Sequence, residues 1–451
     1  MKQFLSALVL FIVSLAQGSA FPQSSDPLTD AATEDAALMA EVNRRNDALI
    51  NDGYNLTQRW SLETGREKTT AHLEFLVPAV GGEHTFSFWA EMRHGEIGYR
   101  LLGPDGKALV SWSGRKGEAN VSFPAPDGKY VAEIELTPGT SGRAIFGVKG
   151  FALQRCEPEG KPYEERPASS AKGFQWPYLL FLPEKVRSRR LLVVPNNTGF
   201  STQDLEYLRT SGSCEIQRQI GLAERLGTPL LVPLFPRPAA TGETDNLYIH
   251  ALTRASLETK QDPFRRVDLQ LLAMIDDARA ALREKQVEVE AKVFLSGFSA
   301  AGSFVSRFTM LHPERVAAVA CGSPGGWPIA PVADVQGEKL GYPVGLADVK
   351  ELVGKPLDVP KLRHVPWFFY MGDQDANDAV PFRDSFSKAD EEVIFRRFGK
   401  TPVSRWKDAE HLYARVGLEA RFTLYPGAAH SVTPEMEQDI ARFFADLERK
   451  P

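Results

Sequence analysis

The chain has 451 residues, of which 43% are hydrophobic, 25% charged and 10% aromatic. This composition is typical of a soluble protein with a hydrophobic core, and it excludes collagen-like, coiled-coil and wholly disordered chains. The formal net charge is -5 and the basic residues are scattered, so the sequence predicts no nucleic-acid partner. Because the chain is too long for one ordinary domain, we expect two.

Residues 1–20 have the pattern of a secretory signal peptide. Lys2 is followed by an apolar stretch from Phe4 to about Leu15, and Gly18 and Ala20 supply the small residues of a cleavage site. No later segment approaches the roughly 20 apolar residues that cross a bilayer. We therefore expect cleavage after Ala20 and a secreted or periplasmic protein without a membrane anchor.

The first part of the mature chain alternates short apolar runs with turn residues. Residues 21–58 read as a leader segment that is partly helical, and 59–155 carry runs such as HTFSFWAEM and KYVAEIEL between Gly, Pro, Asp and Asn clusters. Strands at this spacing predict a small all-β sandwich domain. A polar, proline-bearing stretch at 156–173 reads as a linker.

Residues 174–451 change to strands that alternate with helices. Continuous apolar runs such as LLVVP and PLLVPLF are separated by helical segments, of which 265–285 is a long amphipathic helix. This pattern predicts a mostly parallel sheet covered by helices on both faces, with its site at the carboxyl ends of the strands. Residues 327–363 lie where such domains insert a cap, and we expect a possible cap there.

A strand at 292–295 runs into the sequence Ser296-Gly297-Phe298-Ser299-Ala300-Ala301-Gly302 and then into a helix. This is the strand, turn and helix context of a nucleophile elbow, with Ser299 at the tip of the turn. The N–H of Ala300 is placed to donate to an oxyanion at the positive end of that helix. The motif departs from G-x-S-x-G at its last position, where Ala301 stands and Gly302 follows.

An activated serine needs a base and an acid that orients it, in the order Ser, acid, His along this topology. The strand VPWFFYMG ends in Gly372-Asp373-Gln374-Asp375, which indicates Asp375 as the acid, with Asp378 as the alternative. The final strand leads into Ala428-Ala429-His430, which indicates His430 as the base.

The remaining site residues follow from strand ends with weaker signals. The turn after LLVVP should supply the second oxyanion donor, for which we take Asn197, with Asn196 and Thr198 left open. Trp327 is a possible substrate-binding residue as a wall of the pocket. His250 could line the site, although a packing or loop-anchoring role is favoured.

The segments around Ser299, Asp375 and His430 resemble the three catalytic segments of the α/β-hydrolase superfamily. Within it the chain is most similar to secreted serine esterases of the polyhydroxybutyrate-depolymerase-like and feruloyl-esterase-like kinds. The resemblance covers about 174–451 and implies a hydrolase that cleaves small-molecule or polymeric carboxylic esters through an acyl-enzyme, without metal or cofactor.

Three alternatives remain open at this point. A serine peptidase or an acyltransferase could use the same three residues on the same fold, and an exported binding protein could carry an inert hydrolase domain. No cysteine or histidine cluster has zinc-ligand spacing, and no nucleotide-binding glycine motif precedes a helix, so no metal or cofactor is predicted. The sequence carries no signal for an oligomeric state.

Three cysteines allow at most one disulfide. We favour a bond between Cys156 and Cys214. Cys321 lies in the apolar run VAAVAC, where a small buried side chain is the favoured interpretation.

Overall fold

The computed structural model describes residues 37–449 except 43, 47, 50, 51, 53, 64–68, 78–82, 125–127, 150–159, 197–202, 204, 239–246, 383 and 384. The signal peptide expected at 1–20 therefore lies outside the described residues. The chain divides into two compact units, Met1–Gln154 and Arg155–Pro451.

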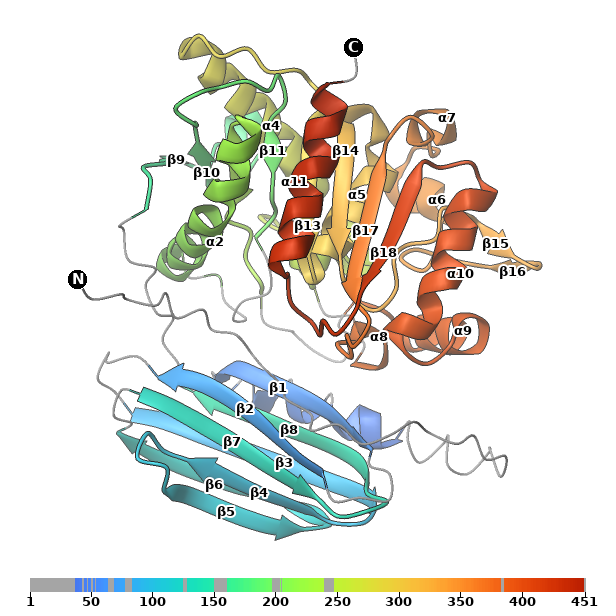
Figure 1. The fold of residues 1–451 in the computed structure, drawn as a ribbon. Helices are drawn as coiled ribbons and strands as arrows, with labels where there is room; N and C mark the ends of the chain where they lie inside the picture. The colour runs from blue at the N-terminus through green and yellow to red at the C-terminus, as the bar shows by residue number, and fades with distance from the viewer. Residues whose placement is uncertain are drawn as a thin grey trace. The chain divides into compact units, whose positions relative to one another are not determined.

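The N-terminal unit is a sandwich of two antiparallel four-stranded sheets, in the orders β1-β8-β3-β6 and β2-β7-β4-β5 (Figure 1). Helical residues 37–42, 44–46 and 48–49 precede it. The strands are β1 (Tyr54–Glu63), β2 (Thr69–Val77), β3 (Glu83–His94), β4 (Ile97–Leu102), β5 (Ala108–Gly114), β6 (Lys116–Pro124), β7 (Gly128–Leu136) and β8 (Ser141–Lys149).

Alternating side chains build the core of the sandwich. Ile97, Tyr99 and Leu101 of β4 are at most 1% exposed, whereas Arg100 between them is exposed. Tyr99 stacks on Phe88 of β3, with a ring-centroid distance of 3.9 Å, and thereby joins the two sheets. The period of two thus buries one face of each sheet against the other, and the predicted all-β sandwich is confirmed.

The C-terminal unit contains an eight-stranded sheet in the order β18-β17-β14-β13-β11-β12-β10-β9. Strands β12, β11, β13, β14, β17 and β18 run parallel, and β10 and β9 are antiparallel additions at one edge. The strands are β9 (Glu164–Arg166), β10 (Tyr178–Phe181), β11 (Leu192–Val193), β12 (Leu230–Pro233), β13 (Val293–Phe298), β14 (Val316–Gly322), β17 (Trp367–Gly372) and β18 (Ala420–Tyr425).

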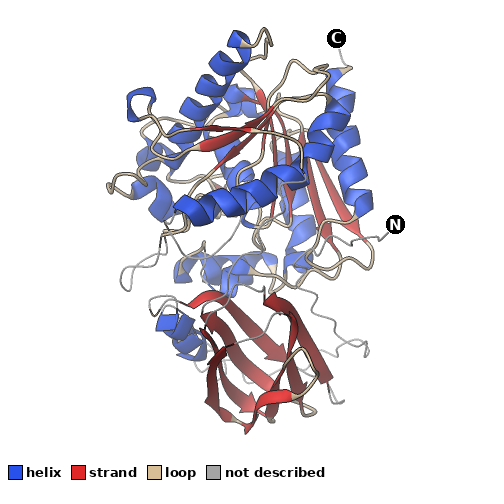
Figure 2. Ribbon diagram, turned by 90° about the vertical axis from the view of Figure 1, so that its left-hand side faces the viewer, coloured by secondary structure: helices blue, strands red, loops and turns tan. Residues whose placement is uncertain are grey.

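Helices cover both faces of this sheet (Figure 2). Helix α2 packs with α11 over one face, and α4 and α5 pack on strands from the other (Figure 1). The helices of the unit are η1 (Ser170–Lys172), α2 (Leu205–Leu226), η2 (Ile249–Ala251), α3 (Arg254–Glu258), α4 (Val267–Glu284), α5 (Ala300–Leu311), η3 (Pro313–Arg315), α6 (Val349–Val353), α7 (Val359–Leu362), α8 (Ala379–Phe382), α9 (Lys388–Phe398), α10 (Pro402–Arg415) and α11 (Pro434–Glu448).

The strand order, the parallel centre and the helices on both faces are those of the α/β-hydrolase fold, which confirms the fold class predicted from the sequence. Strands β13, β14 and β17 are buried along nearly their whole length. Strands covered on both faces need continuous apolar runs, which is why these segments do not alternate.

Two segments between the last strands pack together. The chain from β14 to β17 contains a small hairpin, β15 (Asp334–Val335) and β16 (Glu338–Lys339), followed by α6 and α7. Apolar residues between Trp327 and Val344 form one cluster with residues of α8, α9 and α10, whereas Leu346, Val349 and Leu362 belong to the main core. The first part of the segment 327–363, expected as a possible cap, is therefore packed against the helices that lie between β17 and β18.

The expected linker at 156–173 differs from the structure in its second half. Glu164–Arg166 forms β9, which pairs antiparallel with β10 and extends the sheet. Glu164 also receives a 2.6 Å hydrogen bond from Lys285, just after α4. A charged strand at a sheet edge has no apolar signature, so its composition resembles a linker.

Cys214 is disulfide-bonded, and Cys321 is a buried free thiol. Cys156, the expected partner of Cys214, lies outside the described residues. None of the helices in the described part of the chain combines the length and the apolar character that crossing a membrane requires.

Candidate active site

Ser299 occupies a strained turn between β13 and α5. Its backbone has φ 59° and ψ -123°, a conformation that costs energy for a residue with a side chain. The Ser299 N–H donates to Gly322 O at 2.9 Å, and the Ser299 carbonyl accepts from Ser303 N at 3.1 Å. The turn is thus fixed by β14 on one side and by α5 on the other, and the serine side chain is partly exposed.

Two glycines let helix α5 approach the strands beneath it, Gly297 toward β13 and Gly302 toward β14. A Cβ at Gly297 would lie 2.3 Å from Ala301 O, and a Cβ at Gly302 would lie 2.3 Å from Gly322 O. Ala301 is itself 2% exposed. The close approach to β14 therefore falls on Gly302, which explains why alanine is accepted where the usual motif has its last glycine.

Asp375 and His430 lie at the ends of neighbouring strands and are hydrogen-bonded. His430 Nδ1 is 2.9 Å from Asp375 Oδ2 and 3.1 Å from Oδ1. The Asp375 side chain is 1% exposed and the His430 side chain 24% exposed. Asn377 N also donates to Asp375 Oδ1 at 2.9 Å. The buried carboxylate is therefore held from both sides, and the imidazole keeps an open edge.

The loops that carry these two residues are bonded to each other. Gln374 N donates to Ala428 O at 2.9 Å, and Gly427 N donates to Asp373 Oδ1 at 2.8 Å. A Cβ at Gly372 would lie 2.0 Å from Ala428 O, so only glycine permits this approach. The loops therefore act as one unit that sets the position of the imidazole.

His430 also contacts the strand that carries the serine. Its ring lies 4.7 Å from the ring of Phe298, centroid to centroid, and Phe298 directly precedes Ser299. The structure thus brings the three residues expected from the sequence to the carboxyl ends of β13, β17 and β18.

Asp378, the alternative acid, is bound by Arg405 instead of a histidine. Arg405 is fully buried and donates to both carboxylate oxygens, at 2.9 and 2.7 Å. It also donates to Gly326 O and Gly399 O, each at 2.9 Å. Burial raises the pKa of Asp378, and the bidentate ion pair opposes this change. Because its carboxylate is occupied, we do not retain Asp378 as the acid.

Of the two residues taken as oxyanion donors, Ala300 lies in the described part of the chain and Asn197 does not. Ala300 is the first residue of α5, so its N–H has no acceptor within the helix and lies at the positive end of the helix dipole. Asn197 lies outside the described residues. Its neighbour Asn196 is 4% exposed.

Trp327 is a core residue. It is 1% exposed, its indole N–H donates to Val344 O at 2.9 Å, and its ring stacks on Phe398 at 4.2 Å. The expected role as a pocket wall is not retained, because packing and a hydrogen bond already use both the ring and the N–H. The glycines around Trp327 indicated a loop, and the distant Phe398 could not be recognised from the sequence.

Sequence reasoning did not single out Arg405, Phe298 or Tyr248. Tyr248 packs with Ala251 and Ala300, so it lies beside the nucleophile turn. One sequence feature could have identified Arg405: it lies on the apolar face of an amphipathic helix, where a charged side chain needs a buried partner. In the described part of the chain, no three His, Cys, Asp or Glu side chains gather so that they could hold a metal ion.

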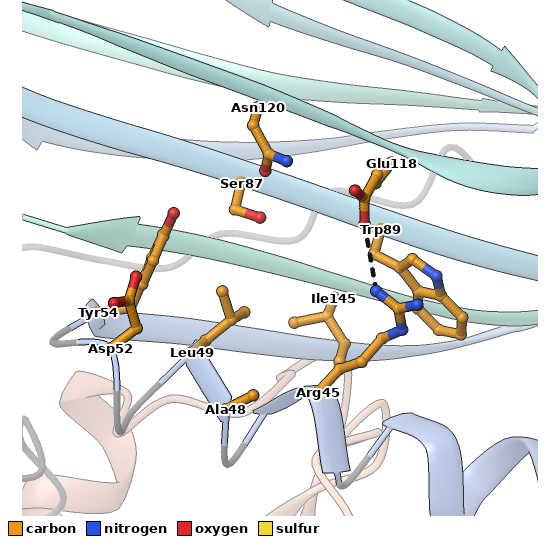
Figure 3. A pocket seen from close by; sticks show the side chains of 10 residues that line it. All are labelled: Arg45, Ala48, Leu49, Asp52, Tyr54, Ser87, Trp89, Glu118, Asn120 and Ile145. Carbon is orange, nitrogen blue, oxygen red and sulfur yellow. Dashed lines mark hydrogen bonds and ion pairs between the residues drawn. The ribbon is translucent and has the colours of Figure 1, made fainter.

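A pocket of about 290 Å³ lies in the N-terminal unit between the leader helix and the sheet of β3, β6 and β8 (Figure 3). Arg45 lies 4.6 Å from the ring centroid of Trp89 and donates to Glu118 at 3.2 Å. Arg45 thus covers the Trp89 ring and occupies the Glu118 carboxylate. We assign no chemistry to this pocket.

No protein-family model matches the sequence, and no curated protein matches it. Solved structures resemble it in fold. Poly(aspartic acid) hydrolase-1 from Sphingomonas sp. KT-1 has 16% identity and a TM-score of 0.43, over 64% of this chain and 98% of that one. A ferulic acid esterase has 14% identity and a TM-score of 0.35, over 65% and 99%. MPT51 (FbpC1) of Mycobacterium tuberculosis has 15% identity and a TM-score of 0.38, over 64% and 98%.

Proposed function

We propose that the C-terminal unit is a serine hydrolase that cleaves carboxylic esters through an acyl-enzyme. Ser299 is the nucleophile, His430 the general base and Asp375 the acid that orients the imidazole. The observation that carries this proposal is the strained Ser299 turn at the end of β13, combined with a buried carboxylate 2.9 Å from His430 Nδ1.

The proposed reaction has two stages. Ser299 Oγ attacks the ester carbonyl carbon while His430 Nε2 takes its proton, and the same proton passes to the alkoxide that leaves. Water then attacks the acyl-enzyme, His430 again takes a proton and returns it to Ser299, and the carboxylic acid departs. Asp375 accepts from Nδ1, which leaves the Nε2 lone pair free for Ser299 and stabilises the imidazolium.

The oxyanion is held by backbone N–H groups. Ala300 supplies one, at the start of α5, and the turn after β11 supplies the other, for which Asn197 is the candidate. Such donors act in a site without bulk water, where each contributes about 10²- to 10³-fold to kcat. The substrate is a small-molecule or polymeric ester outside the cytoplasm, in keeping with the signal peptide proposed at 1–20.

The test compares Ser299→Ala with Ser306→Ala. Ser306 lies on helix α5, which Ser299 precedes, and it is 1% exposed, so it controls for the change of residue type at a position away from the turn. We expect Ser299→Ala to lose hydrolysis of a short p-nitrophenyl ester and labelling by a fluorophosphonate, with an unchanged Tm, and Ser306→Ala to retain both activities. Labelled or fully active Ser299→Ala would refute the proposal.

Assays of the wild-type protein distinguish the three alternative functions. An inert binding protein does not react with the fluorophosphonate. A peptidase cleaves an aminopeptidase or dipeptidyl substrate panel in preference to esters, and an acyltransferase gives transfer products when alcohols are added. A panel of acyl chain lengths, feruloyl esters and polyesters then defines the substrate class.

A further inference from the structure

Three residues from separate elements meet beside the nucleophile turn. Asn196 follows β11, Phe235 follows β12, and His250 lies in η2. Their exposed fractions are 4%, 1% and 3%, so all three are buried. The contacts between them tie together segments that are up to 54 positions apart in the sequence.

Asn196 pairs with the backbone of Phe235 through both ends of its amide. Asn196 Nδ2 donates to Phe235 O at 2.7 Å, and Phe235 N donates to Asn196 Oδ1 at 3.1 Å. The side chain thus acts as a strand partner would, at a point where both strands have ended. Aspartate lacks the donor and leucine lacks both groups, so this pairing requires an amide.

His250 donates a second hydrogen bond to the same carbonyl oxygen, that of Phe235. Its Nε2 lies 2.9 Å from Phe235 O, and because a carbonyl only accepts, Nε2 carries the proton. The other nitrogen, Nδ1, is buried and without a hydrogen-bond partner among the described residues. Burial lowers the pKa of His250 to about 4, so the ring is neutral at pH 7 and keeps this tautomer.

The group of three contacts the elbow directly. The η2 turn packs on α5, and Tyr248 and Ala251, which flank His250, form a cluster with Ala300. Phe235 also stacks on Phe304 of α5, at 6.0 Å between ring centroids. Asn196 is therefore connected through two packed paths to the helix whose first N–H is the proposed oxyanion donor.

We propose that Asn196 is a positioning residue for ester hydrolysis: its amide, with His250 on the same carbonyl, fixes the chain at Asn196, directly before the residue proposed as the second oxyanion donor, beside the helix that begins at Ala300. This inference rests on the proposed function. Asn196 and His250 should therefore affect the stability of the transition state and not the binding of the ester. The reason is that the oxyanion forms only in the transition states and the tetrahedral intermediates.

The experiment uses four variants of the full chain and the short p-nitrophenyl ester. Asn196→Asp and Asn196→Ala should lower kcat about a hundredfold with KM changed less than about threefold, because a small misplacement of a donor weakens transition-state binding. His250→Phe should lower kcat in the same direction. His250→Gln, whose amide N–H can replace Nε2–H, should recover most of it.

A second measurement reads the oxyanion site itself. A boronic acid forms a tetrahedral adduct with Ser299, so its inhibition constant should rise in each variant by the factor by which kcat/KM falls. Asn46→Asp is the matched control, because Asn46 is also 4% exposed but belongs to the N-terminal unit. It should leave kcat and the inhibition constant unchanged.

The outcomes distinguish the two proposals. If the wild-type protein neither hydrolyses esters nor reacts with a fluorophosphonate, the proposed function fails. If the wild type is active and Asn196→Asp keeps its kcat, or raises KM at constant kcat, the positioning role is wrong while the function stands. Should Asn196→Asp not fold, the comparison of His250→Phe with His250→Gln decides, and equal loss in both refutes the positioning role.

Discussion

The substitution Asp375→Asn tests which aspartate orients His430. In the wild type, Asp375 Oδ1 accepts from Asn377 N at 2.9 Å and Oδ2 lies 2.9 Å from His430 Nδ1. An asparagine would keep its oxygen toward the Asn377 N–H, so its NH₂ group would face Nδ1. That group donates, and the imidazole would have to move its proton to Nε2, where it blocks the transfer from Ser299.

The expected loss follows from this tautomer change. Serine hydrolases with the wrong histidine tautomer lose about 10⁴-fold in kcat, which corresponds to about 5.5 kcal/mol of transition-state stabilisation. The substitution exchanges one carboxylate oxygen for an NH₂ group of similar size, so we expect Tm to stay nearly unchanged. The assay is kcat for the p-nitrophenyl ester, with circular dichroism melting as the stability measurement.

The matched variant is Asp378→Asn, which makes the same change three positions later. It replaces the bidentate ion pair by at most one hydrogen bond from Arg405 to the amide oxygen, and it leaves the buried guanidinium without a counter-charge. We expect it to lose about 3–5 kcal/mol of unfolding free energy while the folded fraction keeps kcat within about tenfold. If Asp375→Asn kept more than a tenth of kcat, or Asp378→Asn lost kcat at an unchanged Tm, the assignment would be wrong.

Three further changes test the surrounding structure. Because burial lowers the pKa of His250 to about 4 from 6.5, the unfolded chain binds the proton first, and the unfolding free energy should fall by about 3 kcal/mol as pH drops from about 6.5 to 4. His250→Gln should remove that part of a urea-measured pH profile, and an unchanged profile would contradict the burial argument. Gly302→Val places a side chain against Gly322 O and should lower both Tm and kcat, the unfolding free energy by about 1–3 kcal/mol or more. Trp327→Phe loses the bond to Val344 O and should lower the unfolding free energy by about 1–3 kcal/mol with an unchanged KM, whereas a raised KM would return Trp327 to the substrate pocket.

The fold class could be predicted because its signals are local. A buried strand, a glycine-flanked serine and a helix follow each other within a few residues around Ser299, and the strands before Asp375 and His430 end in the same way. The topology then brings those strand ends to one edge, so the candidate residues meet without any contact having to be predicted.

What the sequence left open depends on distant partners. Asp375 and Asp378 differ in the partner that each finds, and Arg405 lies 27 positions beyond Asp378. The role of Trp327 depends on Phe398, and that of Asn196 on the backbone of Phe235. The edge strand β9 has charged residues that only its pairing with β10 explains. A local sequence pattern carries no information about contacts between residues that are distant in the sequence.

The alkylation rate of the free thiol of Cys321 measures how often the core around the sheet opens. Cys321 is 0% exposed, pairs in register with Gly297 on one side and Phe369 on the other, and has its pKa raised by burial. Because a strand side chain stands on a face of the sheet, a thiol reagent can reach it only when the side chains packed on that face move away from β14. The neighbouring strand β13 is the one that leads into the serine. The alkylation rate of the native protein therefore reports how often the scaffold beneath the nucleophile opens, at a single atom and without an engineered label.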